Sequence, residues 1–388
     1  MKILTIHNRY RYRGGEDESR EAEDKLLAER GHEVRQIVFD NAQISPRNAL
    51  KVGLQATWSQ SSYLRVRNYI TTWRPDVLDV HNFFPLASPS IYYAARRQGI
   101  PVVQTLHNYR ILCPAATFYR KGEICEDCLG HSTPWPGVLH RCYRGSALQT
   151  SAVALMIAAH RLFRTWERVV SLFFVLSEFE KQKFVENGLP ESKIFVKPNF
   201  VADQNGIGSG GGPFLFVGRL SPEKGIVTLL RAIACCRSPA AKFQIIGEGP
   251  LEPLVRDSAS KDTRIDYLGK LPLPEVMPMM GRASAVLVTS EWYETFGRVA
   301  AEAFAVGTPV ICTGLGALGE IVENGRTGFH YQAGDAEGLA RILERTSDEP
   351  DTLNAMRVPA RREYEAKYTA KRNYDLLIQG YTRSIQAP

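Results

Sequence analysis

The feature that most constrains this chain is a repeated alternation of short apolar segments with charged, helix-like ones. Residues 2–7 (KILTIH) read as a strand, residues 20–30 as a helix that Gly31 ends, and residues 32–39 as the next strand. A glycine commonly follows the last turn of a helix. Short strands that alternate with helices predict a parallel, doubly wound α/β sheet.

A glycine-rich segment interrupts this alternation once. Residues 203–212 (DQNGIGSGGG) read as a linker, and the alternation restarts after it. A chain of 388 residues is also too long for one ordinary core. We therefore predict a first domain over 1–202 and a second over 213–365. The remainder, 366–388, reads as an amphipathic helix that could pack back on the first domain.

The composition predicts a cytoplasmic protein with a basic surface. The start of the chain runs directly into a strand, without a secretory signal, and the apolar runs are far shorter than the ~18 residues of a membrane span. The formal charge is +7. It can reflect a basic proteome, anionic lipid or nucleic acid. Residues 62–75 interleave arginine with aromatics. We interpret this segment as a solvated helix face; the alternative is a patch that contacts the inner membrane surface.

Three loops follow strands of the second half, where doubly wound sheets bind ligands. The first is GRLSPEKG (218–225), in which Arg219 and Lys224 flank a turn before a helix. Two cations beside a helix N-terminus suit a diphosphate. The third is GLGALGE (314–320), again glycine-rich and again before a helix.

The second loop, ETFGRVAAE (294–302), carries Glu294 and Glu302. If the segment were all helical, its ends would lie about 12 Å apart, beyond the roughly 5–9.5 Å of paired glycosidase carboxylates. The two glutamates are therefore expected to hold two ends of one long ligand. Glu302 stands among alanines, so it needs a partner such as ligand hydroxyls, unless it is a solvated helix residue. The three loops together describe a pocket for a nucleotide diphosphate joined to a sugar.

These motifs resemble those of a known family. GRLSPEKG, ETFGRVAAE, VGTPVI and GLGALGEIVENGRTGF, in this order, resemble the C-terminal domain of the retaining GT-B glycosyltransferases of family 4, or glycosyl transferases group 1. RGGED, DVLDVHNFFPL and TLHNYR are similar to the N-terminal domain. The resemblance implies two Rossmann-like domains facing a cleft. It also implies transfer of a sugar from a UDP or GDP sugar to a glycan or lipid-linked acceptor with retention, in cell-surface or exopolysaccharide synthesis.

The resemblance also assigns roles to individual residues. It implies that Glu294 contacts the donor sugar, that Glu302 binds the ribose, and that Arg219 and Lys224 bind the diphosphate as it leaves. His107, which ends the TLH strand, is the catalytic candidate of the N-terminal domain. The remaining nucleotide-sugar positions are Gly14 and Gly15, in the loop below the phosphate, and Gly218, Phe296, Gly297 and Gly316.

The chain departs from the family's pattern at three of these loop positions. Thr295 stands where the family often has glycine, Arg298 where an apolar or amide residue is usual, and Ala317 where a second glycine is frequent. These departures put the identity of the donor sugar in doubt. There is no Asp-x-Asp run that would hold a divalent ion on a nucleotide diphosphate. No catalytic divalent metal is expected, so the cations and helix N-termini would neutralise the leaving group.

Four cysteines are grouped in an insert over about 108–145. Their spacing, C-x11-C-x2-C-x13-C, comprises Cys113, Cys125, Cys128 and Cys142. In a cytosolic protein a CxxC pair with two outlying cysteines favours a structural zinc site over disulfides. Reduced thiols and a redox or iron–sulfur role stay open, and His131 or His140 could replace one ligand.

Three other functions compete with the transferase. A Rossmann-type oxidoreductase needs a G-x-G-x-x-G after the first strand, which HNRYRYRGGED does not match. A nucleotide-sugar epimerase or a sugar phosphorylase on the same fold would take similar ligands. A basic, zinc-containing nucleic-acid binder is disfavoured because the cysteine spacing does not fit the usual finger with a recognition helix. No nucleic-acid partner is therefore expected.

Overall fold

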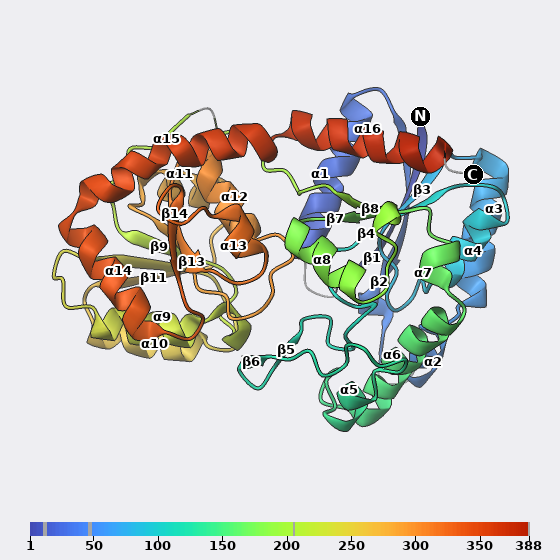
Figure 1. Ribbon diagram of the computed structural model, residues 1–388, viewed down its shortest axis with the longest axis horizontal. Coiled ribbons are helices and arrows are strands. Elements are labelled where there is room, and N and C mark those ends of the chain that lie inside the picture. Colours follow the sequence, from blue (N-terminus) through green and yellow to red (C-terminus); the bar gives the residue numbers. More distant parts are fainter. Residues whose placement is uncertain (11–13, 46–48, 205, 387–388) are drawn as a thin grey trace. The chain divides into compact units, whose positions relative to one another are not determined.

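A computed structural model describes residues 1–10, 14–45, 49–204 and 206–386. They form two compact units (Figure 1). Unit 1 comprises Met1–Phe118, Cys125–Pro198 and Asn373–Pro388, and unit 2 comprises Tyr119–Ile124 and Asn199–Arg372. The chain thus changes units after Phe118, Ile124, Pro198 and Arg372, whereas the predicted domain boundaries were residues 202 and 365.

Unit 1 is built on a six-stranded parallel sheet of order β2-β1-β3-β4-β7-β8. Its strands are β1 (Lys2–Arg9), β2 (Glu33–Asp40), β3 (Val77–Asn82), β4 (Val102–Thr105), β7 (Leu172–Val175) and β8 (Ile194–Val196). All residues of β3, β4 and β7 are buried, as expected for parallel strands covered on both faces. The strand order reverses between β1 and β3, which is where doubly wound sheets bind ligands.

The helices of unit 1 begin at capping residues that the sequence supplies. Ser59, Ser146 and Ser177 each accept a hydrogen bond from a backbone N–H in the first turn that follows, which satisfies a donor the helix itself leaves open. The elements are α1 (Gly15–Glu29), η1 (Asn41–Gln43), α2 (Ala49–Gln55), α3 (Gln60–Trp73), α4 (Ser90–Arg96), α5 (Trp135–Leu139), α6 (Ala147–Leu162), α7 (Thr165–Arg168), α8 (Glu178–Glu186) and η2 (Glu191–Lys193). The insert also contains a short hairpin, β5 (Tyr119–Arg120) and β6 (Glu123–Ile124), whose residues are grouped with unit 2.

Unit 2 has a second six-stranded parallel sheet, of order β11-β10-β9-β12-β13-β14. Its strands are β9 (Phe214–Val217), β10 (Phe243–Ile246), β11 (Ile265–Gly269), β12 (Val286–Val288), β13 (Val310–Thr313) and β14 (Gly328–Tyr331). Its helices are η3 (Pro222–Lys224), α9 (Ile226–Cys235), α10 (Glu252–Lys261), α11 (Leu273–Arg282), α12 (Arg298–Ala305), α13 (Ala317–Ile321), α14 (Ala336–Asp348) and α15 (Pro350–Lys367). Two α/β domains with parallel sheets are thus confirmed.

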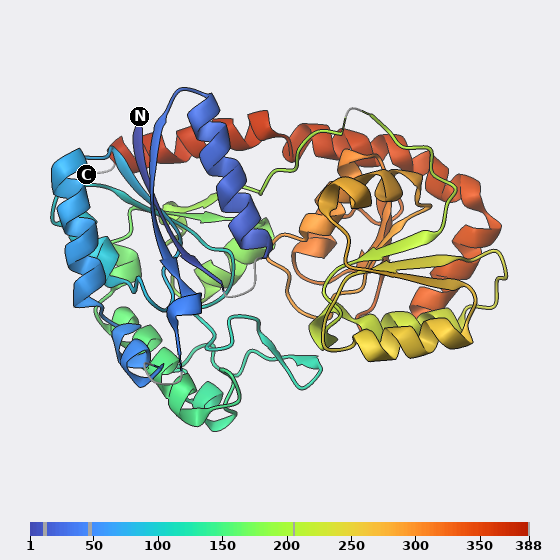
Figure 2. The same ribbon diagram turned by 180° about the vertical axis from the view of Figure 1, so that it is seen from behind.

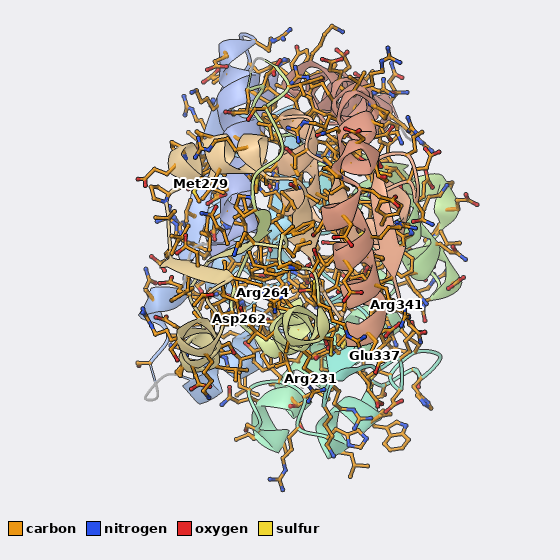
Figure 3. The ribbon with its side chains drawn as sticks, turned by 90° about the vertical axis from the view of Figure 1, so that its left-hand side faces the viewer. Arg231, Asp262, Arg264, Met279, Glu337 and Arg341 are labelled. Carbon is orange, nitrogen blue, oxygen red and sulfur yellow. The ribbon has the colours of Figure 1, made fainter. Side chains whose placement is uncertain are left out.

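One ion pair of unit 2 closes the end of a helix. Arg264 donates to the Asp262 carboxylate at 2.7 Å and to the backbone carbonyls of Ile233 and Cys236, at the C-terminus of α9, at 2.7 and 2.6 Å (Figure 3). The last carbonyls of a helix have no N–H donor within the helix itself. The guanidinium therefore joins α9 to the start of β11.

The last helix, α16 (Ala370–Gln386), brings the end of the chain to unit 1 (Figures 1 and 2). Its Leu377 and Tyr381 lie in one core cluster with Ile3 and Phe174, and the Tyr381 hydroxyl donates to the Asp79 carboxylate at 2.6 Å. Within the described ranges, no helix is both long and apolar enough to cross a membrane.

We expect Gly380→Ala to lower the free energy of unfolding of unit 1 by about 1–3 kcal/mol. A Cβ at Gly380 would overlap the ring of Phe174 and lie 3.1 Å from Leu172 Cδ2. Phe174 and Leu172 are both buried residues of β7, so their side chains have little room to move. Urea unfolding measures the effect, with Thr382→Ala, at an exposed position of the same helix, as the control. Equal stability of the two variants would contradict this packing.

Candidate functional site

The three predicted loops of unit 2 follow β9, β12 and β13, and these neighbouring strands bring the loops together. Gly225 ends η3 with a φ of +67°, and a Cβ there would overlap the carbonyl oxygen of Thr289. Only glycine permits so close an approach of the two loops. The Thr289 hydroxyl donates to the Lys224 carbonyl at 2.7 Å, and the Glu291 N–H donates to the Glu223 carbonyl at 2.9 Å. The first two loops are therefore fixed to one another.

Lys224 and Glu294 form an ion pair at the centre of this site. The Lys224 ammonium donates to the Glu294 carboxylate, and the Ser290 hydroxyl donates to the same oxygen at 2.7 Å. Burial by itself would raise the pKa of Glu294, but the charge of Lys224 and the hydrogen bonds outweigh it and lower that pKa. Glu294 therefore stays ionised. The Lys224 ammonium also lies 5.3 Å from the centroid of the Trp292 ring.

Glu302 is buried in α12, with 5% of its surface exposed, so the alternative of a solvated helix glutamate is wrong. Its carboxylate accepts a hydrogen bond from Arg298 Nε at 2.8 Å, one turn earlier on the same helix. The i, i+4 spacing of this pair is visible in the sequence and predicts a contact on one face of a helix. In the sequence analysis, however, Arg298 was interpreted only as a departure from the family's pattern. Because α12 begins at Arg298, the first four of the nine residues of 294–302 are not helical.

Two glycines shape the loops around Glu294. Gly297 is the N-cap of α12 with a φ of +72°, and a Cβ there would lie 2.6 Å from Leu318 Cδ2. Gly316 precedes α13 with a φ of +61°, and the next residue, Ala317, donates its N–H to the Glu294 carbonyl at 3.3 Å. Phe296 is buried, and its ring packs on that of Tyr368 at 5.7 Å. Its side chain is thus part of the core.

Gly218 and Arg219 lie at the end of β9. The Gly218 N–H donates to the Ile246 carbonyl at 3.0 Å, and a Cβ at the neighbouring Gly247 would overlap the Gly218 carbonyl oxygen. The backbone is therefore held close to β10 at this point. The Arg219 side chain is exposed, and as a mobile cation it could reach an anionic ligand at the sheet edge.

The remaining predicted residues lie in unit 1. Gly14 is the N-cap of α1 and Gly15 its first residue, and the Gly14 N–H donates to the Asp17 carboxylate at 3.0 Å. Asp17 in turn lies 2.7 Å from His7 Nε2. A buried carboxylate thus links the first strand to the glycine loop.

His107 is partly buried just after β4, where its Nε2 lies 3.0 Å from Nδ1 of His81. Burial, and then the positive charge of His81, lower the pKa of His107 well below its usual range. Burial would also lower the pKa of His81, but Asp79, 3.4 Å away, and Glu23 outweigh it and raise that pKa. These opposite shifts favour the proton on His81 over His107; a protonated His81 would donate from Nδ1 to Nε2 of a neutral His107, whose own proton would then lie on Nδ1. A cavity of about 20 Å³ beside them has room for one water.

The predicted residues therefore form two groups. Arg219, Lys224, Glu294 and Glu302 lie near the strand ends of unit 2, and His107 lies near those of unit 1, together with His7 and His81. Asp79, Glu23 and Ser290 were not predicted. Glu23 lies far in the sequence from His81 and Lys197, whereas Asp79 and Ser290 lie only two and four residues before their partners His81 and Glu294, at spacings that predict no contact by themselves.

The four cysteines of the insert share one neighbourhood. Burial, followed by the nearby thiols of Cys113, Cys142 and Cys125, raises the pKa of Cys128 to about 12. None of the seven cysteines, all of which lie in the described ranges, is in a disulfide. However, no group of three or more His, Cys, Asp or Glu side chains among the described residues is arranged to hold a metal ion. The structural zinc site stays a prediction without support from this geometry.

Comparison with known families defines the class of this chain. Residues 25–199 match the glycosyl transferase 4-like domain, and residues 200–363 match the glycosyl transferases group 1 domain. The chain therefore has the domain composition of a group 1 glycosyltransferase. The resemblance seen in the motifs is confirmed to this extent.

Individual relatives are similar over part of their length. The chain is 29% identical over 296 residues to the glycogen synthase of Mycobacterium tuberculosis, a match that covers 72% of the chain and 62% of that enzyme. It is 33% identical over 182 residues to the D-inositol 3-phosphate glycosyltransferase of Rhodococcus erythropolis, which covers 44% of the chain and 40% of that enzyme. The chain thus matches less than two thirds of the length of either relative.

Solved structures share the fold over nearly the whole chain. HepE of Anabaena, in complex with UDP, has a TM-score of 0.71 at 18% identity, with 98% of this chain and 100% of that chain covered. Sucrose-phosphate synthase from Thermosynechococcus elongatus has a TM-score of 0.71 at 17% identity, with 98% of each chain covered. At these identities the likeness concerns the fold.

Proposed function

We propose that this protein is a retaining glycosyltransferase. It moves a sugar from a nucleotide diphosphate sugar to a glycan or lipid-linked acceptor, in the synthesis of a cell-surface polysaccharide or exopolysaccharide. The observation that carries the proposal is the Lys224–Glu294 ion pair at the strand ends of unit 2. It places a fixed cation and an ionised carboxylate side by side, and a diphosphate joined to a sugar needs both.

Each group of the site has a task in this reaction. Lys224, with Arg219, would stabilise the negative charge that develops on the leaving diphosphate. Glu294 would accept hydrogen bonds from hydroxyls of the donor sugar, and Glu302, oriented by Arg298, would accept them from the ribose. The backbone N–H groups at Gly297 and Gly316 lie at helix starts, which favour anions. His107, neutral and with its proton on Nδ1, would donate a hydrogen bond to the reacting sugar.

Relatives suggest where to begin with the donor. HepE has been crystallised with UDP, with UDP and glucose, and with UDP-glucose. A UDP sugar is therefore the first donor to test, followed by GDP sugars. A nucleotide-sugar epimerase or a sugar phosphorylase on the same fold would use the same pocket, and product analysis separates them: an epimer of the donor, or a free sugar phosphate, in place of a glycoside.

Ligand-induced thermal stabilisation is the experiment that tests the donor site. UDP, GDP, ADP, dTDP, CDP, their common sugar conjugates and NAD(H) would be compared. A ligand at 100 times its Kd adds about 2.7 kcal/mol of stability. We expect a shift with one nucleoside diphosphate, and a larger one with one of its sugars. A shift with NAD(H) alone would overturn the proposal in favour of an oxidoreductase.

The variant Glu302→Gln should weaken binding of that nucleotide about tenfold or more, because a hydrogen bond to a charged group contributes about 1.5–3 kcal/mol. Glu337→Gln, at an exposed position of α14 (Figure 3), is the matched control and should bind as the wild type does. Titration calorimetry measures both. Unchanged affinity in Glu302→Gln would contradict the ribose-binding role.

A further inference from the structure

Large apolar side chains that face solvent concentrate on three helices of unit 1, α2, α5 and α6. The α2–α5–α6 face is defined by seven side chains that are 54–79% exposed: Leu54, Trp135, Leu139, Leu148, Leu155, Leu162 and Phe163. More than half of the exposed large apolar side chains of the described residues belong to it. A concentration of this kind on a protein surface marks an interaction site.

The pattern on α6 is regular. Leu148, Leu155 and Leu162 are spaced by seven residues, so they lie on one side of the helix, two turns apart. The opposite side carries the buried Val153, Met156 and Ile157. One side of α6 therefore packs on unit 1, and a leucine stripe faces outward. The polar stripe of an ordinary surface helix is missing on this side.

The three helices form one continuous surface. Both α2 and α5 pack against α6, and the three lie side by side in both views of the ribbon (Figures 1 and 2). A cavity of about 450 Å³ lies between α2 and α6, and the exposed Leu54, Leu148 and Leu155 are among its walls. Its size is that of a ligand pocket. Because the exposed leucines also line it, the cavity extends the apolar face inward.

The two chain segments that carry this face are basic, although Glu167 pairs with Arg164 beside Phe163 and Asp127 lies 3.9 Å from His140 at the end of α5. Residues 41–75 contain five Lys and Arg, and residues 128–166 contain four, without a single Asp or Glu in either segment. The three helices lie within these two segments. Arg144 is exposed and lines the cavity, and Arg141 is exposed just before α6. The face is thus complementary to an anionic surface.

The same features weigh against other occupants. In a symmetric dimer through this face, two predominantly basic surfaces would meet, and like charges in contact are unfavourable. Basic residues beside Leu, Phe and Trp are the composition of helices that lie in the membrane–water interface. We propose that the α2–α5–α6 face docks on a bilayer of anionic phospholipid, with its leucines in the acyl region and its arginines at the headgroups.

This inference deepens the proposed function, since docking at a bilayer would bring the protein to a lipid-linked acceptor. The docking face contains no residue of the donor site in unit 2. The docking proposal and the proposed function can therefore fail separately. No vesicle binding, together with a normal thermal shift by the nucleotide, would contradict docking alone. No thermal shift by any nucleotide, together with intact vesicle binding, would contradict the transferase function alone.

Co-sedimentation with vesicles tests the proposal. The full chain should bind vesicles of phosphatidylglycerol and phosphatidylcholine at least tenfold more tightly than vesicles of phosphatidylcholine. The triple variant Leu148→Ser, Leu155→Ser and Leu162→Ser should lose tenfold or more in binding. The control Leu254→Ser and Leu273→Ser, at exposed apolar positions of unit 2, should bind as the wild type does. Equal binding to both kinds of vesicle, or unchanged binding of the triple variant, would overturn the proposal.

A charge pair and a fluorescence readout sharpen the test. Arg141→Gln with Arg144→Gln should weaken binding to the anionic vesicles roughly thirtyfold, at about 1 kcal/mol for each cation near the surface. Arg256→Gln with Arg341→Gln, whose side chains are 63% and 69% exposed in unit 2, should not. Phosphatidylcholine with brominated acyl chains should quench Trp135, and Trp135→Phe should reduce the quenching. Binding without quenching would contradict insertion of this face and point to adsorption by charge alone.

Discussion

Replacing Lys224 by alanine is expected to lower kcat by roughly 10²–10³, about 2.7–4 kcal/mol of transition-state stabilisation. The ammonium is fixed beside the Glu294 carboxylate, so it needs little reorganisation when charge develops on the leaving diphosphate. Initial rates with the donor identified by thermal shift measure the loss. Lys270→Ala, which removes an exposed lysine paired with Glu248 at another strand end of unit 2, is the control. A loss of tenfold or less would contradict a role for Lys224 in the chemical step.

The structure suggests a second reason for such a loss, and a double-mutant cycle separates the two. Lys224 also lowers the pKa of the partly buried Glu294, so Lys224→Ala would disturb the carboxylate as well. If the lysine acted only through Glu294, it would add nothing to the effect of Glu294→Gln, and the double variant would be as active as that single variant. We expect the double variant to be slower than Glu294→Gln alone, because Lys224 acts on the diphosphate itself.

Lys197→Met is expected to destabilise unit 1 by about 3–5 kcal/mol, the cost of leaving a buried charge without its ionic partner. The Lys197 ammonium donates to the Glu23 carboxylate, and their side chains are 0% and 3% exposed. Asn373 of α16 donates to the same carboxylate at 3.2 Å. This ion pair therefore joins α1, the end of β8 and the last helix, which are far apart in the sequence.

Urea unfolding followed by tryptophan fluorescence measures this effect, because four of the five tryptophans belong to unit 1. The control is Lys181→Met, which removes a partly exposed pair with Glu191 at 2.9 Å and should change stability by no more than about 1 kcal/mol. Lys197→Met with Glu23→Leu should recover part of the loss, because no buried charge is then left alone. A loss in Lys197→Met as small as in the control would show that the pair adds nothing to stability.

The fold and the donor-side loops could be predicted from the sequence because their signals are local. Strand and helix periodicity, Gly31 after the first helix and the linker at 203–212 are all visible in short windows. Lys224 and Glu294 could be named because each lies in the loop that follows a strand, and the ends of parallel strands meet at one edge of a sheet.

The tertiary structure decided which groups are partners. The pair of Glu23 with Lys197 and that of Asp79 with Tyr381 join residues 174 and 302 positions apart. The sequence shows that Arg298 and Glu302 are one helical turn apart, but only the structure shows that Glu302 is buried and that the two side chains form an ion pair. The exposure of Leu148, Leu155 and Leu162 could not be predicted from the sequence either, because an apolar stripe at helical spacing predicts a face that packs in the core. Periodicity shows that one side of a helix is apolar, whereas only the packing of the whole unit decides whether that side is covered.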